Sequence, residues 1–77
     1  DLVLKTNYDS NFSEIKTTIL NFASSHNLVL QDPKPEILVT DLSETTIVFT
    51  VKVWTNNNDY AKVTSDILEF SKSEISL

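Results

Sequence analysis

The strongest strand pattern in the chain lies in the stretch Thr46-Ile47-Val48-Phe49-Thr50-Val51-Lys52-Val53-Trp54-Thr55. β-Branched and aromatic residues dominate it, and successive side chains of a strand point to opposite faces of a sheet. Ile47, Phe49 and Val51 therefore share one face, whereas Val48 and Trp54 share the other. The pattern predicts a strand over residues 46–55 with the first of these faces buried in a core.

Two further strands are predicted upstream of this one. Residues 36–42 also alternate, and only the polar residues 43–45 separate them from the strongest strand. A link this short favours an antiparallel hairpin. Pro33 and Pro35 mark a break before the hairpin, since proline cannot donate a ladder hydrogen bond. A short strand is also predicted over residues 2–6.

Two amphipathic helices are predicted, one before the hairpin in the sequence and one after it. Their apolar residues recur at offsets of three and four and line one side of each helix. These residues are Phe12, Ile15, Ile19, Phe22 and Ala23 in the first helix, and Tyr60, Val63, Ile67 and Phe70 in the second. Asn11 is the predicted cap of the first helix, with Ser10 as the rival. Asn58 or Asp59 is the predicted cap of the second.

The order strand, helix, strand, strand, helix predicts an α+β fold with two layers, in which both helices cover one face of the sheet. It corresponds to a ferredoxin-like β-α-β-β-α arrangement that lacks the last strand or is truncated before it. The 77 residues suffice for a single domain, residues 1–77. Because the sequence opens on Asp1 rather than Met, we expect it to be a fragment of a larger protein.

Composition excludes several classes of function. Lys and Arg total 6 against 11 Asp and Glu, which gives a net charge of −5 and no basic stripe for nucleic acid or anionic lipid. No apolar run approaches the ~20 residues that cross a bilayer. The chain has no glycine for phosphate-binding loops and no cysteine for a metal site. We therefore expect a soluble fragment without direct membrane contact.

No motif predicts catalysis. His26 is the one histidine, and no carboxylate or serine stands at a defined spacing from it. Catalytic and metal sites need several converging groups, so His26 is interpreted as a helix-terminal histidine favoured by the helix dipole. We predict that the chain is not an enzyme and has no catalytic, cofactor-binding or metal-binding residue.

The face opposite the core is the candidate interaction surface. Val48 and Trp54 are predicted there, with Leu38 and Leu42 beside them, and a solvated face would be polar instead. A subunit interface at Val48 and Trp54 is one reading, and local packing of Trp54 against the turn or the helix ends is the other. Leu68 lies off the apolar stripe of the second helix, so we expect it to contact something else.

Three segments resemble the C-terminal domain of the small-conductance mechanosensitive channel (MscS) family. The helix entry Tyr8-Asp9-Ser10-Asn11 resembles that family's YDSD. The segment Val51-Lys52-Val53-Trp54-Thr55-Asn56-Asn57-Asn58-Asp59 is similar to its VRVWSNSGD. Residues 42–47 stand where the family has LGxSSI, with Ser43 or Glu44 in place of the glycine. The resemblance covers residues 4–70 and carries no catalytic residue.

The resemblance implies a function in a membrane protein. It implies a cytosolic domain at the inner membrane, within a homoheptameric channel that opens under bilayer tension in osmotic shock. The subunits wall a vestibule through which ions and small solutes pass, and a strand beyond the second helix joins a parallel barrel. The alternative is a free-standing ferredoxin-like regulatory module that binds a small ligand or a protein partner.

Overall fold

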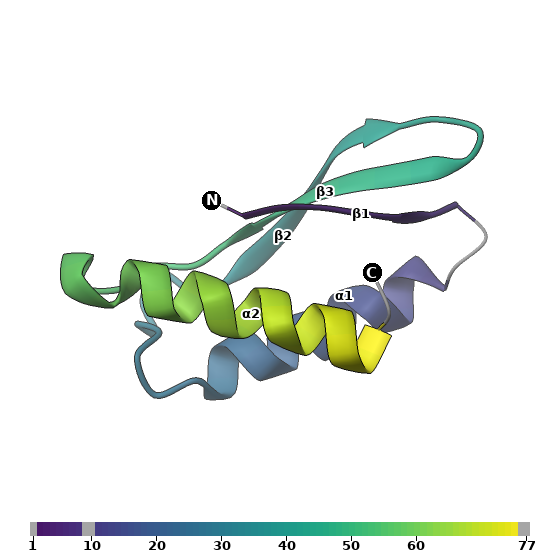
Figure 1. The fold of residues 1–77 in the computed structure, drawn as a ribbon. Coiled ribbons are helices and arrows are strands. Elements are labelled where there is room, and N and C mark those ends of the chain that lie inside the picture. The colour runs from purple at the N-terminus through teal and green to yellow at the C-terminus, as the bar shows by residue number, and fades with distance from the viewer. Residues whose placement is uncertain (1, 9–10, 76–77) are drawn as a thin grey trace.

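The computed structural model describes residues 2–8 and 11–75. Asp9 and Ser10, part of the predicted helix entry, lie outside the described residues. The elements follow in the order β1 (Leu2–Asn7), α1 (Phe12–Ser25), β2 (Glu36–Leu42), β3 (Thr46–Lys52), the short 3₁₀ helix η1 (Asn57–Asp59) and α2 (Tyr60–Ile75). This order confirms the predicted α+β class and the β-α-β-β-α arrangement (Figure 1).

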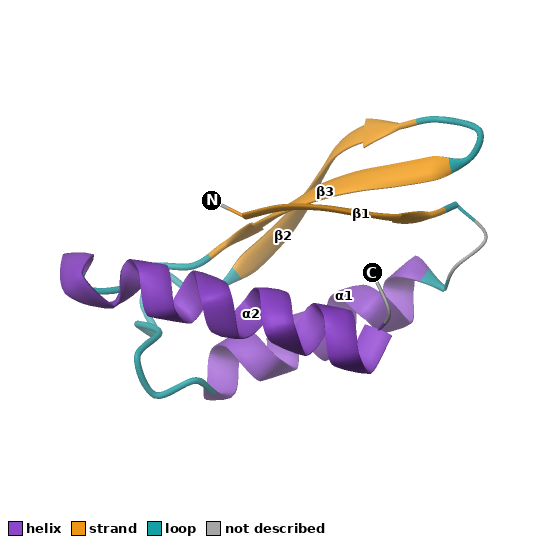
Figure 2. Cartoon of the chain, viewed as in Figure 1, coloured by secondary structure: helices purple, strands orange, loops and turns teal. Residues whose placement is uncertain are grey.

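The strand with the strongest pattern is the central strand of the sheet. The three strands are ordered β1-β3-β2, and both neighbours run antiparallel to β3. Val51 lies opposite Leu2 on one side and Ile37 on the other. Neighbouring strands cover both edges of β3 and the helices cover the face that Phe49 and Val51 share (Figure 2), so both side chains are fully buried.

Both helices pack on the same face of the sheet, as predicted, which gives two layers (Figure 2). Phe49 contacts Phe12 of α1 edge-on, with ring centroids 5.2 Å apart. The rings of Phe22 and Phe70 stack at 4.2 Å and join α1 to α2. The buried apolar core consists of Leu4, Ile15, Ile19, Ala23, Val29, Ile37, Ile47, Phe49, Val51, Val63 and Ile67.

The first helix begins at the predicted cap. The Asn11 side chain accepts a hydrogen bond from the Glu14 backbone N–H at 3.3 Å, which satisfies one of the free donors of the first turn. The helix ends at Ser25, and His26 leaves it with extended backbone angles. The structure thus confirms the predicted Asn11 cap of α1.

The central strand is shorter than predicted. It ends at Lys52, not at residue 55, so the prediction that Trp54 belongs to this strand was wrong. The reason is a lack of partners: Lys52 faces Glu36, the first residue of β2, and Pro35 before it cannot donate a ladder bond. Beyond this point the chain bonds to a loop instead, and the Leu30 N–H donates to the Trp54 carbonyl at 2.7 Å.

The start of the second helix also differs from the prediction. Asn58 and Asp59 lie within η1, a 3₁₀ turn that directly precedes Tyr60, the first residue of α2. The 3₁₀ turn is closed by the Asp59 N–H, which donates to the Asn56 carbonyl at 2.9 Å. A run of turn-forming residues can satisfy its backbone groups in this way without a capping side chain.

Candidate functional site

The face of the sheet away from the helices, here called the open face, carries Val48. This residue lies between Lys5 of β1 and Asp41 of β2 and is half-buried. The next row on the same face is Val3, Thr50 and Leu38, in which Thr50 is buried and its two neighbours are 59% and 43% exposed. The open face is therefore partly apolar, as the sequence predicted.

Leu42 does not belong to the open face, and the prediction that placed it beside Val48 was wrong. The register of β2 shifts between Val39 and Asp41, so that Asp41 lies opposite Val48 and Leu42 opposite Ile47. An additional residue in one strand reverses the faces of the side chains that follow it. Leu42 therefore shares the side of the buried Ile47, although its own side chain is 58% exposed.

Trp54 lies in the loop between β3 and η1. Its side chain is half-buried, and its backbone carbonyl accepts the hydrogen bond from Leu30. Strand alternation cannot assign its face, because the strand ends two residues earlier. The structure thus separates the two candidate interface residues: Val48 lies within the sheet, and Trp54 lies beyond the end of its strand.

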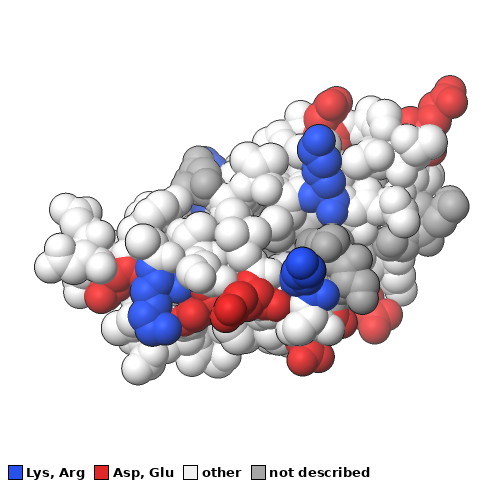
Figure 3. Space-filling view, viewed as in Figure 1, with Lys and Arg blue, Asp and Glu red and all other residues white. Residues whose placement is uncertain are grey.

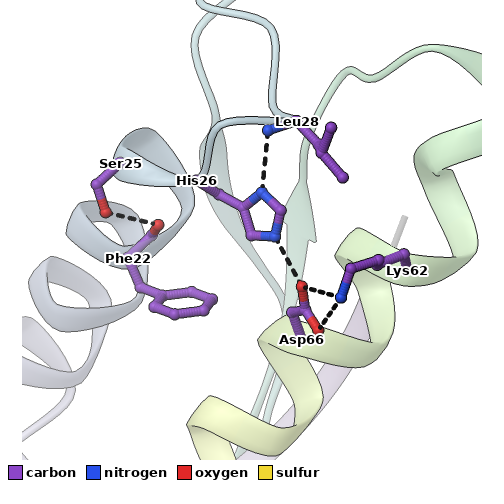
Figure 4. Close-up of polar contacts among 6 residues, drawn as sticks. All are labelled: Phe22, Ser25, His26, Leu28, Lys62 and Asp66. Carbon is purple, nitrogen blue, oxygen red and sulfur yellow. Dashed lines mark hydrogen bonds and ion pairs between the residues drawn. The ribbon is translucent and has the colours of Figure 1, made fainter.

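A polar cluster that the sequence did not predict joins the two helices (Figure 4). His26, directly after α1, places its Nε2 2.8 Å from the Asp66 Oδ2 of α2. Its Nδ1 accepts a hydrogen bond from the Leu28 backbone N–H at 3.1 Å. The His26 side chain is 9% exposed, and the Phe22 ring meets it edge-on. The cluster therefore connects the C-terminal end of α1 to α2.

These contacts define the tautomer of His26. A backbone N–H can only donate, so the Nδ1 that accepts from Leu28 carries no proton. The ring proton is then on Nε2, which donates to Asp66. Both ring nitrogens are engaged in this geometry, and neither is left to act as a general base. The contact between His26 and Asp66 connects the two helices. It could not be predicted from sequence because the two residues are 40 positions apart.

Asp66 is held in its charged form by this arrangement. The hydrogen bond from His26 lowers the pKa of the Asp66 carboxyl below its ordinary value of 3.8, and partial burial opposes that effect. Lys62, one turn earlier on α2, adds a smaller contribution with its Nζ 3.3 Å from Oδ2. The hydrogen bond from His26 and the ion pair with Lys62 therefore both stabilise the charged form of Asp66.

In residues 2–8 and 11–75, no group of three or more His, Cys, Asp and Glu side chains could hold a metal ion. None of the helices in this described part combines the length and the apolar character that a membrane span requires. On the side shown in Figure 3, acidic and basic side chains are interspersed over α2, with no large area of one sign.

Comparison with known proteins identifies the family. Residues 1–70 match the family model described as "Mechanosensitive ion channel MscS, C-terminal". The chain belongs to this family. It is similar to the small-conductance mechanosensitive channel of Edwardsiella ictaluri (strain 93-146), with 25% identity over 69 residues. That alignment covers 90% of the chain and 24% of the relative, so the chain spans about a quarter of the length of the curated relative.

Proposed function

We propose that this chain is a cytosolic domain of a small-conductance mechanosensitive channel. In this role it contributes to subunit assembly and lines a vestibule on the cytosolic side of the inner membrane. Ions and small solutes pass through that vestibule during osmotic shock, and the domain carries out no chemistry itself. The observation that carries the proposal is the family match over residues 1–70.

The open face supports the assembly role. Val3 and Leu38 are large apolar residues that water contacts in the isolated chain, and Val48 is only half-buried. An exposed apolar row of this kind on a sheet is typical of a surface that another protein covers. We propose that Val48 and Trp54 contact a neighbouring subunit in the assembled homo-oligomer, which the family resemblance implies is a heptamer.

Cross-linking tests this role in the membrane protein that carries the chain. Single cysteines are introduced at Val48 or Trp54, positions within a chain that has no cysteine of its own. A bismaleimide is then expected to link subunits through these positions. Lys16→Cys, on the exposed side of α1, is the matched control and should give no adduct. Equal cross-linking at all three positions, or none at Val48 and Trp54, would contradict the proposed interface.

The free-standing regulatory module is not favoured. The family match extends over nearly the whole chain, and the relative that it resembles is a channel. Measurement of channel current in the presence and absence of the domain separates the two functions. A module would bind its ligand without any change in current, whereas a channel domain alters assembly or conductance when it is removed.

A further inference from the structure

The edge of the sheet at β1 is open to another strand. The order β1-β3-β2 places β1 at one edge and β2 at the other in the described part of the chain. β1 pairs with β3 over six consecutive residues without irregularity, whereas β2 contains the register shift after Val39. Bulges obstruct the addition of a strand, and a regular edge with free backbone groups favours it.

A groove of about 500 Å³ lies beside this edge, between β1 and α2. Val3 and Leu68 line it with apolar side chains that are 59% and 45% exposed. Leu68, Ser71 and Lys72 are three and four residues apart, so one side of α2 faces the groove. This explains why Leu68 lies outside the apolar stripe that packs against the sheet.

The floor of the groove contains an unsatisfied hydroxyl. Ser71 is 1% exposed, and its Oγ has no hydrogen-bond partner among the described residues. A buried hydroxyl without a partner is costly, and each such group in a folded protein requires an explanation. A segment placed along β1 lies beside Ser71, where a polar side chain on its helix-facing side can supply the missing partner.

The charges at the groove favour an acidic ligand. Lys5 and Lys72 line it against the one carboxylate of Glu69. The chain as a whole carries net charge −5, with only 6 basic residues. The groove is thus locally basic on an acidic domain, and charge complementarity directs an acidic segment to it in preference to the rest of the surface.

We propose that this groove binds an extended, acidic segment of a partner polypeptide, which adds to the sheet as a strand antiparallel to β1. Apolar side chains on the helix-facing side of the segment pack on Leu68, and the carboxylates on its other side lie beside Val3 and Lys5 on the open face. Main-chain hydrogen bonds to the free edge of β1 supply the remaining affinity, as in other cases of strand addition. This inference concerns the chain itself and does not depend on the channel function.

The test is a titration of the isotope-labelled chain with the peptide acetyl-Glu-Val-Thr-Val-Glu-Val-amide, followed by NMR. Saturable shifts are expected in the amides of β1 and α2, with a Kd below about 1 mM for so short a ligand. The peptide with lysine in place of both glutamates should bind roughly tenfold more weakly. Leu68→Glu, which removes the apolar contact and repels the acidic peptide, should abolish the shifts, whereas Leu42→Glu, at an exposed site on β2, should preserve them.

Three results would overturn the proposal. The first is the absence of saturable shifts in a chain whose spectrum shows that it is folded. The second is equal affinity for the acidic and the basic peptide, or shifts confined to β2. The third is slow hydrogen exchange along both edges of β1 in the free chain, because the groove would then be occupied by the chain's own residues.

Discussion

Replacement of Phe49 by leucine tests the assignment of the two sheet faces. Phe49 is fully buried in the central strand and contacts the Phe12 ring at 5.2 Å. Loss of an aromatic pair costs about 0.5–1.5 kcal/mol, and the volume that leucine leaves unfilled adds to this cost. We therefore expect Phe49→Leu to lower the free energy of unfolding by about 1–2.5 kcal/mol.

The adjacent residue supplies the matched control. Val48 lies on the open face and is half-buried, so Val48→Ala should cost less than about 1 kcal/mol. A chain of 77 residues has a total stability of about 4–12 kcal/mol. A loss of 1 kcal/mol shifts Tm by about 4–8 °C at this size, which makes the two variants easily distinguished.

Urea unfolding measures both losses, with the fluorescence of the single tryptophan, Trp54, as the probe. The free energy of unfolding is expected to be highest for the wild type, lower for Val48→Ala and lowest for Phe49→Leu, with unchanged m-values. If Val48→Ala destabilises the chain as much as Phe49→Leu, the open face is covered within the monomer. The assignment of that face to a subunit contact would then be wrong.

Three further predictions concern the helix cap, the Asp66 carboxylate and the surface charge. Asn11→Ala removes the side-chain acceptor at the start of α1 and should lower the free energy of unfolding by about 1 kcal/mol; no loss in urea unfolding would contradict the cap. The lowered pKa of Asp66, due first to the hydrogen bond from His26, means that its contribution to stability is present above the ordinary pKa of 3.8 and is lost as pH falls through the lowered value. The stability difference between wild type and Asp66→Asn should therefore shrink in strong acid, and a difference that does not change with pH would exclude the pair as its source. In the channel, neutralising Glu14 and Glu44, exposed carboxylates outside the open face, should shift the reversal potential toward weaker cation preference if acidic side chains of this domain enrich cations in the vestibule; unchanged selectivity would refute that effect.

Local patterns were sufficient for most of the fold. The alternation of Ile47, Phe49 and Val51 predicted the buried face, because side-chain direction in a regular strand depends only on residue parity. The helix starting after Asn11 was predicted for a similar reason: capping depends on residues three positions apart. In each case the determining contacts lie within a few residues of one another, where sequence reasoning works best.

The predictions from sequence were wrong or incomplete where contacts between residues far apart in the sequence determine the structure. The register shift before Leu42 depends on pairing between β2 and β3, and β3 ends at Lys52 because its partner strand begins only after Pro35. His26 and Asp66 meet because α1 and α2 pack together, which no spacing in the sequence encodes. The open face was therefore predicted only in part: Val48 belongs to it, whereas Leu42 does not, and Trp54 lies outside the strand.

We propose that the chain serves a channel opened by bilayer tension. The most direct measurement is a patch-clamp recording of the membrane protein that carries it, reconstituted in liposomes under stepped suction. We predict a current that opens with tension and that is altered by Val48→Lys but not by Lys16→Ala. Absence of any tension-dependent current in protein that is folded and inserted would contradict the account.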